Sequence, residues 1–170
     1  MIKKVLWLLF FPISLLMGCG VYSFTGGSIS AGMKTVSVLV FENTAPLVNP
    51  NLSQSFTEAL KDRIRTQTSL SFVRVDGDAD FSGRITDYNL QPVAIQANEK
   101  VTAGLTRLTI TVNVKYTNKI EADKSFEQSF TRFKDFSTAG SPFASQETAL
   151  VKDINQQLTE DIYNRAFANW

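Results

Sequence analysis

The chain has 170 residues, with 17 lysines and arginines against 16 aspartates and glutamates, one cysteine and no histidine. This near-neutral charge gives no electrostatic footprint for nucleic acid, and without histidine the chain lacks the side chain best suited to acid–base catalysis and metal binding near neutral pH. The sequence also contains no phosphate-binding glycine loop, nucleophile elbow or EF-hand loop, so we expect no enzyme and no cofactor.

The first element in the chain is a short apolar run that ends at the only cysteine. Two lysines precede an apolar stretch over residues 5–16, and the small Gly18 suits a peptidase that cuts just before Cys19. This order is typical of a bacterial lipoprotein signal. We expect residues 1–18 to be removed and Cys19 to carry covalent lipid, which anchors the protein to a membrane. The alternatives are an ordinary secretory signal and a transmembrane helix, but the run is shorter than the ~20 residues that a span needs.

The mature chain is long enough for one domain behind a tether. Residues 19–34 begin with the acylated cysteine and are rich in glycine and serine, which indicates a tether or a short first strand. Residues 35–170 then form the single predicted domain. Gly20 follows the cysteine where an aspartate would favour the inner membrane, so by resemblance to known lipoprotein sorting we expect the outer membrane.

The first half of the domain predicts a strand, a helix and a strand. Residues 35–42 are rich in β-branched and aromatic side chains, as a buried strand requires. Apolar residues recur every fourth position over residues 52–66 and so share one helical face, and Asn51 with Gln54 resembles a capping box. Residues 70–75 predict the next strand. The acidic run that follows is the nearest approach to a cation site, and we interpret it as a turn.

The second half of the domain predicts three strands and a helix. A strand over residues 81–90 precedes the most regular segment, 105–117, where apolar and polar side chains alternate strictly. Residues 124–134 pair with it as a hairpin, with Phe133 at the wrong parity for the core side, which indicates a bulge or a two-sided strand. Start signals at residues 141–145 introduce a last helix with apolar residues every fourth position.

Together these elements predict an α+β fold in two layers. Two amphipathic helices pack on one face of a mixed, mostly antiparallel sheet of four to five strands. Because one face of strand 105–117 is polar, we expect that side of the sheet to meet water or a polar partner.

With these elements in order, the chain resembles the LptE family of lipopolysaccharide-assembly lipoproteins, in the manner of its Bacteroidetes-like branch. The resemblance covers nearly the whole mature chain and is one of layout, without a catalytic signature; it is carried by residues 19–24, 41–46, 50–63, 81–88, 107–112, 126–130 and 166–170. It implies a lipid-anchored protein on the periplasmic side of the outer membrane. Such a protein plugs the LptD β-barrel, helps to assemble it, and assists insertion of lipopolysaccharide into the outer leaflet.

Basic side chains near a barrel-facing surface are the candidates for contact with the barrel or with the phosphates and carboxylates of lipopolysaccharide. These are Arg107 and Lys115 on the polar strand face, with Arg132 and Lys134 on the neighbouring strand. The competing interpretation of all four is a solvated sheet face.

A second function class gives a similar sequence. A lipoprotein adaptor of another envelope machine, such as an activator of a peptidoglycan synthase, would also combine a lipid anchor, a leader and a small α/β domain. Residues 20–34, fully extended, reach only about 50 Å. Such a short leader favours work close to the membrane.

Overall fold

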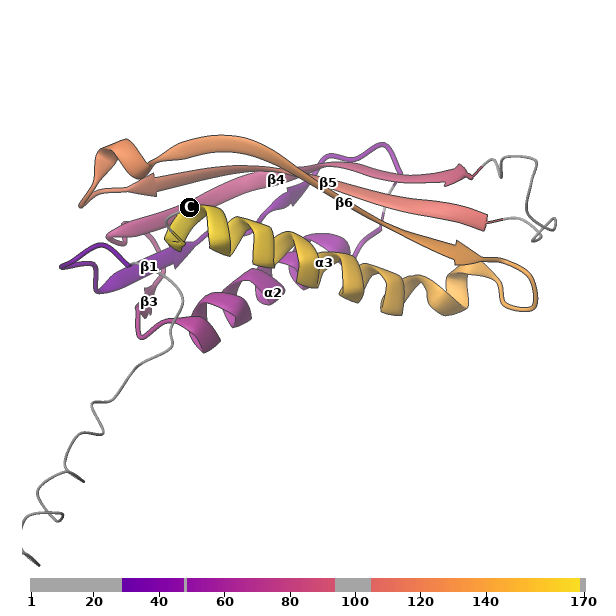
Figure 1. Ribbon diagram of the computed structural model, residues 1–170, viewed down its shortest axis with the longest axis horizontal. Helices are drawn as coiled ribbons and strands as arrows, with labels where there is room; N and C mark the ends of the chain where they lie inside the picture. Colours follow the sequence, from indigo (N-terminus) through magenta and orange to yellow (C-terminus); the bar gives the residue numbers. More distant parts are fainter. Residues whose placement is uncertain (1–28, 48, 94–104, 169–170) are drawn as a thin grey trace, which may run out of the picture.

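The computed structural model describes residues 29–47, 49–93 and 105–168, and it has the predicted two layers (Figure 1). Helices α2 (Leu52–Gln67) and α3 (Phe143–Phe167) lie side by side on one face of a mixed sheet. Within the described residues the sheet has six strands: β1 (Thr35–Val38), β2 (Glu42–Asn43), β3 (Ser71–Val73), β4 (Ala79–Pro92), β5 (Leu105–Asn118) and β6 (Phe126–Ser137).

The strand order β3-β1-β4-β5-β6 joins a parallel half to an antiparallel half. Strand β1 pairs in parallel with both β3 and β4, so the predicted strand-helix-strand unit is confirmed as β1-α2-β3. Strands β4, β5 and β6 pair antiparallel in sequence order. The short 3-10 helix Ala122–Lys124 lies between β5 and β6, and the predicted hairpin is confirmed.

The sheet has more strands than predicted because the expected strand 35–42 divides in two. After β1 the backbone turns Phe41 fully into the core, where its N–H donates to Thr57 Oγ1 of α2 over 3.1 Å. Strand β2 then pairs with β4 further along, at Arg84 and Ile85. The Thr57 hydroxyl thus satisfies the Phe41 N–H at the point where the strand is interrupted.

The core lies between the sheet and the two helices, on the faces that the periodicities predict. The even-numbered residues of β5 from Leu108 to Tyr116 are buried, as are the predicted helix positions at every fourth residue. Tyr88 and Tyr116 are both in this core. The hydroxyl of Tyr88 donates to Glu147 Oε1 over 2.5 Å, whereas the hydroxyl of Tyr116 has no partner among the described residues, and burial raises the pKa of Tyr116 to about 12.

The structure corrects one local prediction and decides between the two alternatives of another. The side chain of Asn51 makes no cap at the start of α2, so the predicted capping box is wrong; the Asn51 N–H instead donates to Asn49 Oδ1 over 3.0 Å. The pairing of β5 with β6 keeps one register from Leu105 to Tyr116, without a bulge. Phe133 therefore lies on the opposite face from Phe130, and β6 is the two-sided strand of the two alternatives.

Candidate functional site

The broad face of the sheet that points away from the helices is the candidate functional surface. Because successive side chains of a strand point to opposite faces, the odd-numbered residues of β5 and their register partners on β6 lie together on this side. The structure places no helix of the described ranges over it (Figure 1). We call this set the polar face: Arg107, Thr109, Thr111, Asn113, Lys115, Glu127, Ser129, Thr131, Phe133 and Asp135.

Uncharged hydrogen-bonding groups occupy the centre of the polar face. The hydroxyls of Thr111 and Thr131 lie 3.0 Å apart across the two strands, and Asn113 Nδ2 donates to Ser129 Oγ over 3.4 Å. Hydroxyl and amide groups can exchange water for a partner's polar groups at low cost, provided that the new hydrogen bonds form. The centre of the polar face is therefore suited to a wet or hydrogen-bonding contact.

Arg107 lies at one end of the polar face and is already engaged by its neighbours. Its guanidinium donates Nε and an Nη to the two oxygens of Asp135 over 2.7 and 2.8 Å. This contact raises the pKa of Arg107 and lowers the pKa of Asp135. The guanidinium also lies 3.8 Å above the ring centroid of Phe133, which is 48% exposed. An incoming anion would have to compete with Asp135 for Arg107.

Lys115 lies on the same face near its other end. It lies eight positions from Arg107, about 25 Å along an extended strand, so one small ligand cannot touch both. Lys115 is exposed and forms no ion pair within the described part of the chain. Its register partner Glu127 lies on the same face without forming an ion pair with it, so the Lys115 ammonium has no fixed partner there.

Arg132 and Lys134 lie on the other side of the sheet. Their register partners are Ile110 and Leu108, which face the core. Arg132 donates two hydrogen bonds to Asp161 of α3 over 2.6 and 2.7 Å, which raises its pKa, and Lys134 Nζ lies 3.3 Å from Asp153 Oδ2. The structure therefore brings two of the four predicted contact residues onto the polar face and uses the other two to hold α3 against the sheet edge.

The predicted lipidation residue Cys19 and cleavage residue Gly18 lie outside the described residues. Among the helices in the described ranges, none combines the length and the apolar character needed to cross a bilayer.

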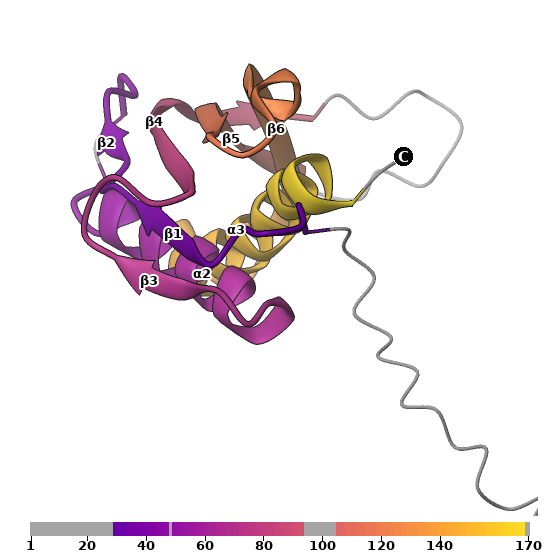
Figure 2. The same ribbon diagram turned by 90° about the vertical axis from the view of Figure 1, so that its left-hand side faces the viewer.

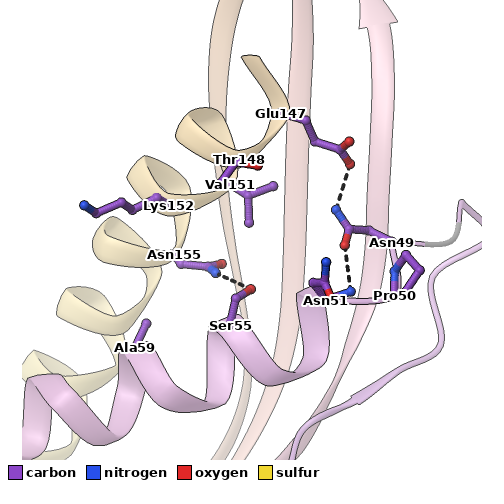
Figure 3. A pocket seen from close by; sticks show the side chains of 10 residues that line it. All are labelled: Asn49, Pro50, Asn51, Ser55, Ala59, Glu147, Thr148, Val151, Lys152 and Asn155. Atoms are coloured by element: carbon purple, nitrogen blue, oxygen red, sulfur yellow. Dashed lines mark hydrogen bonds between the residues drawn. The ribbon is translucent and has the colours of Figure 1, made fainter. Parts of the chain in front are cut away.

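A cavity of about 400 Å³ with both polar and apolar side chains on its walls lies between the first halves of the two helices (Figure 3). Glu147 Oε1 accepts from Asn49 Nδ2 over 2.7 Å as well as from Tyr88, and these contacts tie the start of α3 to β4 and to the segment before α2. Asn155 donates to Ser55 Oγ over 3.3 Å, while its own side-chain oxygen is buried without a partner among the described residues. Most of the polar groups here are used to join the two helices to each other and to the sheet.

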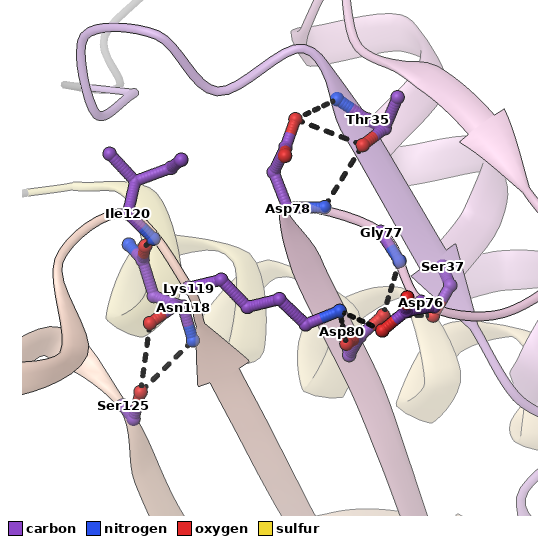
Figure 4. A network of polar contacts seen from close by, with 10 residues as sticks. All are labelled: Thr35, Ser37, Asp76, Gly77, Asp78, Asp80, Asn118, Lys119, Ile120 and Ser125. Atoms are coloured by element: carbon purple, nitrogen blue, oxygen red, sulfur yellow. Dashed lines mark hydrogen bonds and ion pairs between the residues drawn. The ribbon is translucent and has the colours of Figure 1, made fainter.

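The acidic run 76–80 forms the turn that leads into β4, as interpreted, and its carboxylates are occupied by protein groups (Figure 4). Asp78 Oδ2 accepts from the backbone N–H groups of Lys34 and Thr35 over 2.8 and 2.9 Å, and also from the Thr35 hydroxyl. Lys119 Nζ lies 2.5 Å from Asp76 and 2.9 Å from Asp80. In the described parts of the chain no cluster of three acidic, histidine or cysteine side chains could hold a metal ion.

We expect Asp78→Asn to weaken the acid dependence of folding. Three hydrogen bonds donated by Lys34 and Thr35 hold the pKa of Asp78 below its usual value. A lowered folded-state pKa gives stability that is complete above the unfolded-state pKa of about 3.9 and is lost as the pH falls through the folded-state pKa. Urea unfolding at pH 7 and at pH 3 should therefore show a smaller drop for the variant than for the wild type. Equal drops would show that this carboxylate does not stabilise the fold.

Sequence reasoning missed the acidic partners of the predicted cations. Asp135 neutralises Arg107, while Asp153 and Asp161 hold Lys134 and Arg132. For Asp135 the signal was available, because cross-strand pairs of opposite charge stabilise a hairpin once its register is known. The two aspartates of α3 could not be found this way, because their contacts depend on how the helix crosses the sheet.

The comparisons with known proteins match this architecture. The family model described as "LptE: Lipopolysaccharide-assembly" matches residues 33–166. No curated protein sequence gives a significant match.

Among solved structures, the hypothetical protein CT253 from Chlamydia trachomatis superposes with a TM-score of 0.51 at 13% identity, covering 81% of this chain and 99% of that one. A minor lipoprotein from Acinetobacter baumannii gives a TM-score of 0.47 at 16% identity, with 79% and 96% covered. Rare lipoprotein B from Shewanella oneidensis gives 0.48 at 12% identity, with 76% and 90% covered. The likeness to CT253 supports the fold.

Proposed function

Because the chain belongs to the LptE family of lipopolysaccharide-assembly lipoproteins, we propose that it plugs an LptD-like β-barrel in the outer membrane, helps that barrel to assemble, and assists lipopolysaccharide into the outer leaflet. The family consists of cell-envelope lipoproteins that act as assembly proteins, are not enzymes and carry no cofactor. The barrel partner, the outer-membrane location and the contact residues are parts of this proposal and go beyond the family match.

In this proposal the protein is held at the membrane by its N-terminus. Residues 1–18 are removed as a signal peptide, and Cys19 carries the acyl chains. Residues 19–34 tether residues 35–170, the single folded domain. One acyl chain anchors only marginally, so the stable anchor needs the two or three chains that a lipoprotein cysteine carries.

The uncovered polar face is the observation that supports the barrel contact. The lumen of a wide outer-membrane barrel is polar and water-filled, so a plug needs a surface that can hydrogen-bond there. The centre of the polar face offers the hydroxyls of Thr111 and Thr131 and the amide of Asn113. The internal pairing of Arg107 with Asp135 avoids the cost of burying an unpaired charge in such a contact.

Among the basic candidates, we assign direct contact with lipopolysaccharide first to Lys115, whose ammonium forms no ion pair within the described residues. Arg107 is second, because a phosphate would have to displace Asp135. Arg132 and Lys134 would have to leave the aspartates of α3. We therefore expect Lys115→Gln to weaken binding of lipopolysaccharide at low salt more than Lys134→Gln does.

Depletion of the protein tests the proposed function. We expect misfolded barrel protein and reduced lipopolysaccharide at the cell surface, and we expect the acylated protein to co-purify in detergent with a large β-barrel. The contrary result is normal barrel and normal surface lipopolysaccharide with faltering cell-wall synthesis. That result would favour an adaptor of a peptidoglycan synthase.

A further inference from the structure

A basic groove lies at the β3 edge of the sheet, away from the polar face. It has a volume of about 390 Å³ and lies between α2 and the ends of β1 and β3. Lys61, Arg65 and Arg74 line it together with one acidic residue, Glu58, and the apolar side chains Val38, Phe72 and Val73. The whole chain has a formal charge of only +1, so this concentration of positive charge is local.

The basic side chains of the groove can bind an external anion at little cost in folding free energy. Lys61 pairs with Glu58 over 2.9 Å, and Arg65 pairs with Asp62, each within one turn of α2. Exposed pairs of this kind contribute little to stability. Arg74 is exposed and has no ion pair among the described residues, and Arg65 is held over the ring of Phe72 at 5.3 Å. The groove therefore presents oriented cations with weak internal partners.

Exposed aliphatic side chains lie beside these cations. Strands β1 and β3 are parallel neighbours, so their C-terminal ends lie at the same end of the sheet, and the residues after each strand leave the sheet there. Leu39 is 43% exposed there, and Val40 and Val75 are each 66% exposed. A soluble phosphate gains nothing from contact with aliphatic side chains, whereas a bilayer surface binds basic and aliphatic side chains together.

The chain enters the sheet at the start of β1, the strand next to β3. There the Ser71 N–H of β3 donates to the Lys34 carbonyl over 2.9 Å, while the earlier residue Ser30 lies against the end of β5, where its Oγ accepts from Asn118 Nδ2 over 3.1 Å. Strands β1 and β3 lie together next to α2 (Figure 2). The proposed acyl anchor, Cys19, precedes this point in the sequence. Because residues 20–34 reach only about 50 Å when fully extended, an anchor at Cys19 keeps the groove close to the membrane.

From these observations we propose that the groove of Lys61, Arg65 and Arg74 binds the phosphate headgroups of anionic phospholipids, in the leaflet that holds the acyl chains. The aliphatic side chains at the ends of β1 and β3 enter the interface beside them. This proposal rests on the lipid anchor of the proposed function. Strand β5 lies two strands away from β1, so lipid bound at the groove leaves the polar face free for a barrel.

Vesicle binding by an unacylated chain tests the groove without the anchor. The mature chain from residue 19 with Cys19→Ser keeps every core residue, since these lie between Met33 and Phe167. We expect it to bind phosphatidylcholine vesicles that contain phosphatidylglycerol and to lose this binding at high salt. Each basic residue near an anionic surface contributes about fivefold. Arg65→Gln with Arg74→Gln should therefore weaken binding about 25-fold.

A matched control removes two charges elsewhere. Lys124 pairs with Glu121 within one turn, as Arg65 does with Asp62, and Lys152 has no ion pair in the described residues, like Arg74. Lys124→Gln with Lys152→Gln should keep vesicle binding within about twofold, since these residues lie outside the groove. Equal losses in the two double variants would overturn the proposal, as would equal wild-type binding to vesicles without phosphatidylglycerol.

Further measurements show whether the phosphate that the groove binds belongs to a phospholipid. Val40→Ser with Val75→Ser should weaken vesicle binding several-fold, because these exposed side chains enter the interface. Displacement of the protein from vesicles by millimolar inorganic phosphate, or binding to lipopolysaccharide with none to phosphatidylglycerol, would overturn the assignment to phospholipid. Loss of barrel co-purification with unchanged vesicle binding in Arg65→Gln/Arg74→Gln would also overturn it, and would leave the proposed function standing.

Discussion

Replacing Gly83 with alanine is expected to destabilise the domain by about 3 kcal/mol or more. A Cβ at this position of β4 would lie 2.1 Å from the Asn113 carbonyl oxygen of β5 and 2.7 Å from the Phe41 ring. Neither group can move aside at low energetic cost, because the carbonyl belongs to the sheet backbone and the Phe41 ring is fully buried between β1 and β2. Urea unfolding of the two proteins at neutral pH measures the loss.

Ser82→Ala is the control for this prediction. Ser82 is the neighbouring residue in β4, pairs with Lys115 and points to the opposite face, so its replacement leaves the contact with Phe41 intact. We expect a change within about 0.5 kcal/mol for this surface substitution. A Gly83→Ala protein as stable as the Ser82→Ala protein would contradict the close packing of β4, β5 and Phe41.

Thr131→Trp is expected to weaken the complex with the barrel strongly while the domain stays folded. Thr131 is exposed at the centre of the polar face, and a strand accepts tryptophan well. A bulky ring in the middle of a contact that must close around the sheet should cost at least about 2 kcal/mol, roughly thirtyfold in affinity. Co-purification from detergent-solubilised membranes, with circular dichroism of the purified variant, measures both parts of the prediction.

Gln156→Trp supplies the matched surface substitution. Gln156 is exposed on α3, on the opposite side of the molecule from the polar face. We expect the Gln156→Trp variant to keep its complex with the barrel. If instead Gln156→Trp removed the barrel and Thr131→Trp kept it, the helices would be the barrel-facing surface.

The regular elements could be predicted because their periodicities survive tertiary packing. Alternation in β5 from Leu108 to Tyr116 places one face in the core, and the spacing of four in both helices places their buried stripes. The division of β1 from β2 could not be predicted. It depends on the contact between the Phe41 N–H and Thr57, which are brought together only by the fold.

The candidate site was predictable in part. The parity of β5 places Arg107 and Lys115 on the polar face, as expected from the sequence. Parity also held the signal for the other two cations, because Arg132 and Lys134 share the parity of Phe130, which faces the core. Their use as ion-pair partners of α3 was missed because the sequence gives no measure of how far the last helix lies from the sheet edge.

Site-specific photocrosslinking in intact cells tests the central claim most directly. A crosslinking residue placed in turn at Thr109, Thr111 and Ser129 samples the polar face, and the same residue at Gln54 and Gln156 samples the exposed sides of the helices. Our account predicts crosslinks to a large outer-membrane β-barrel from the three strand positions and none from the two helix positions. Barrel crosslinks from the helix positions alone, or no barrel crosslink at all, would contradict it.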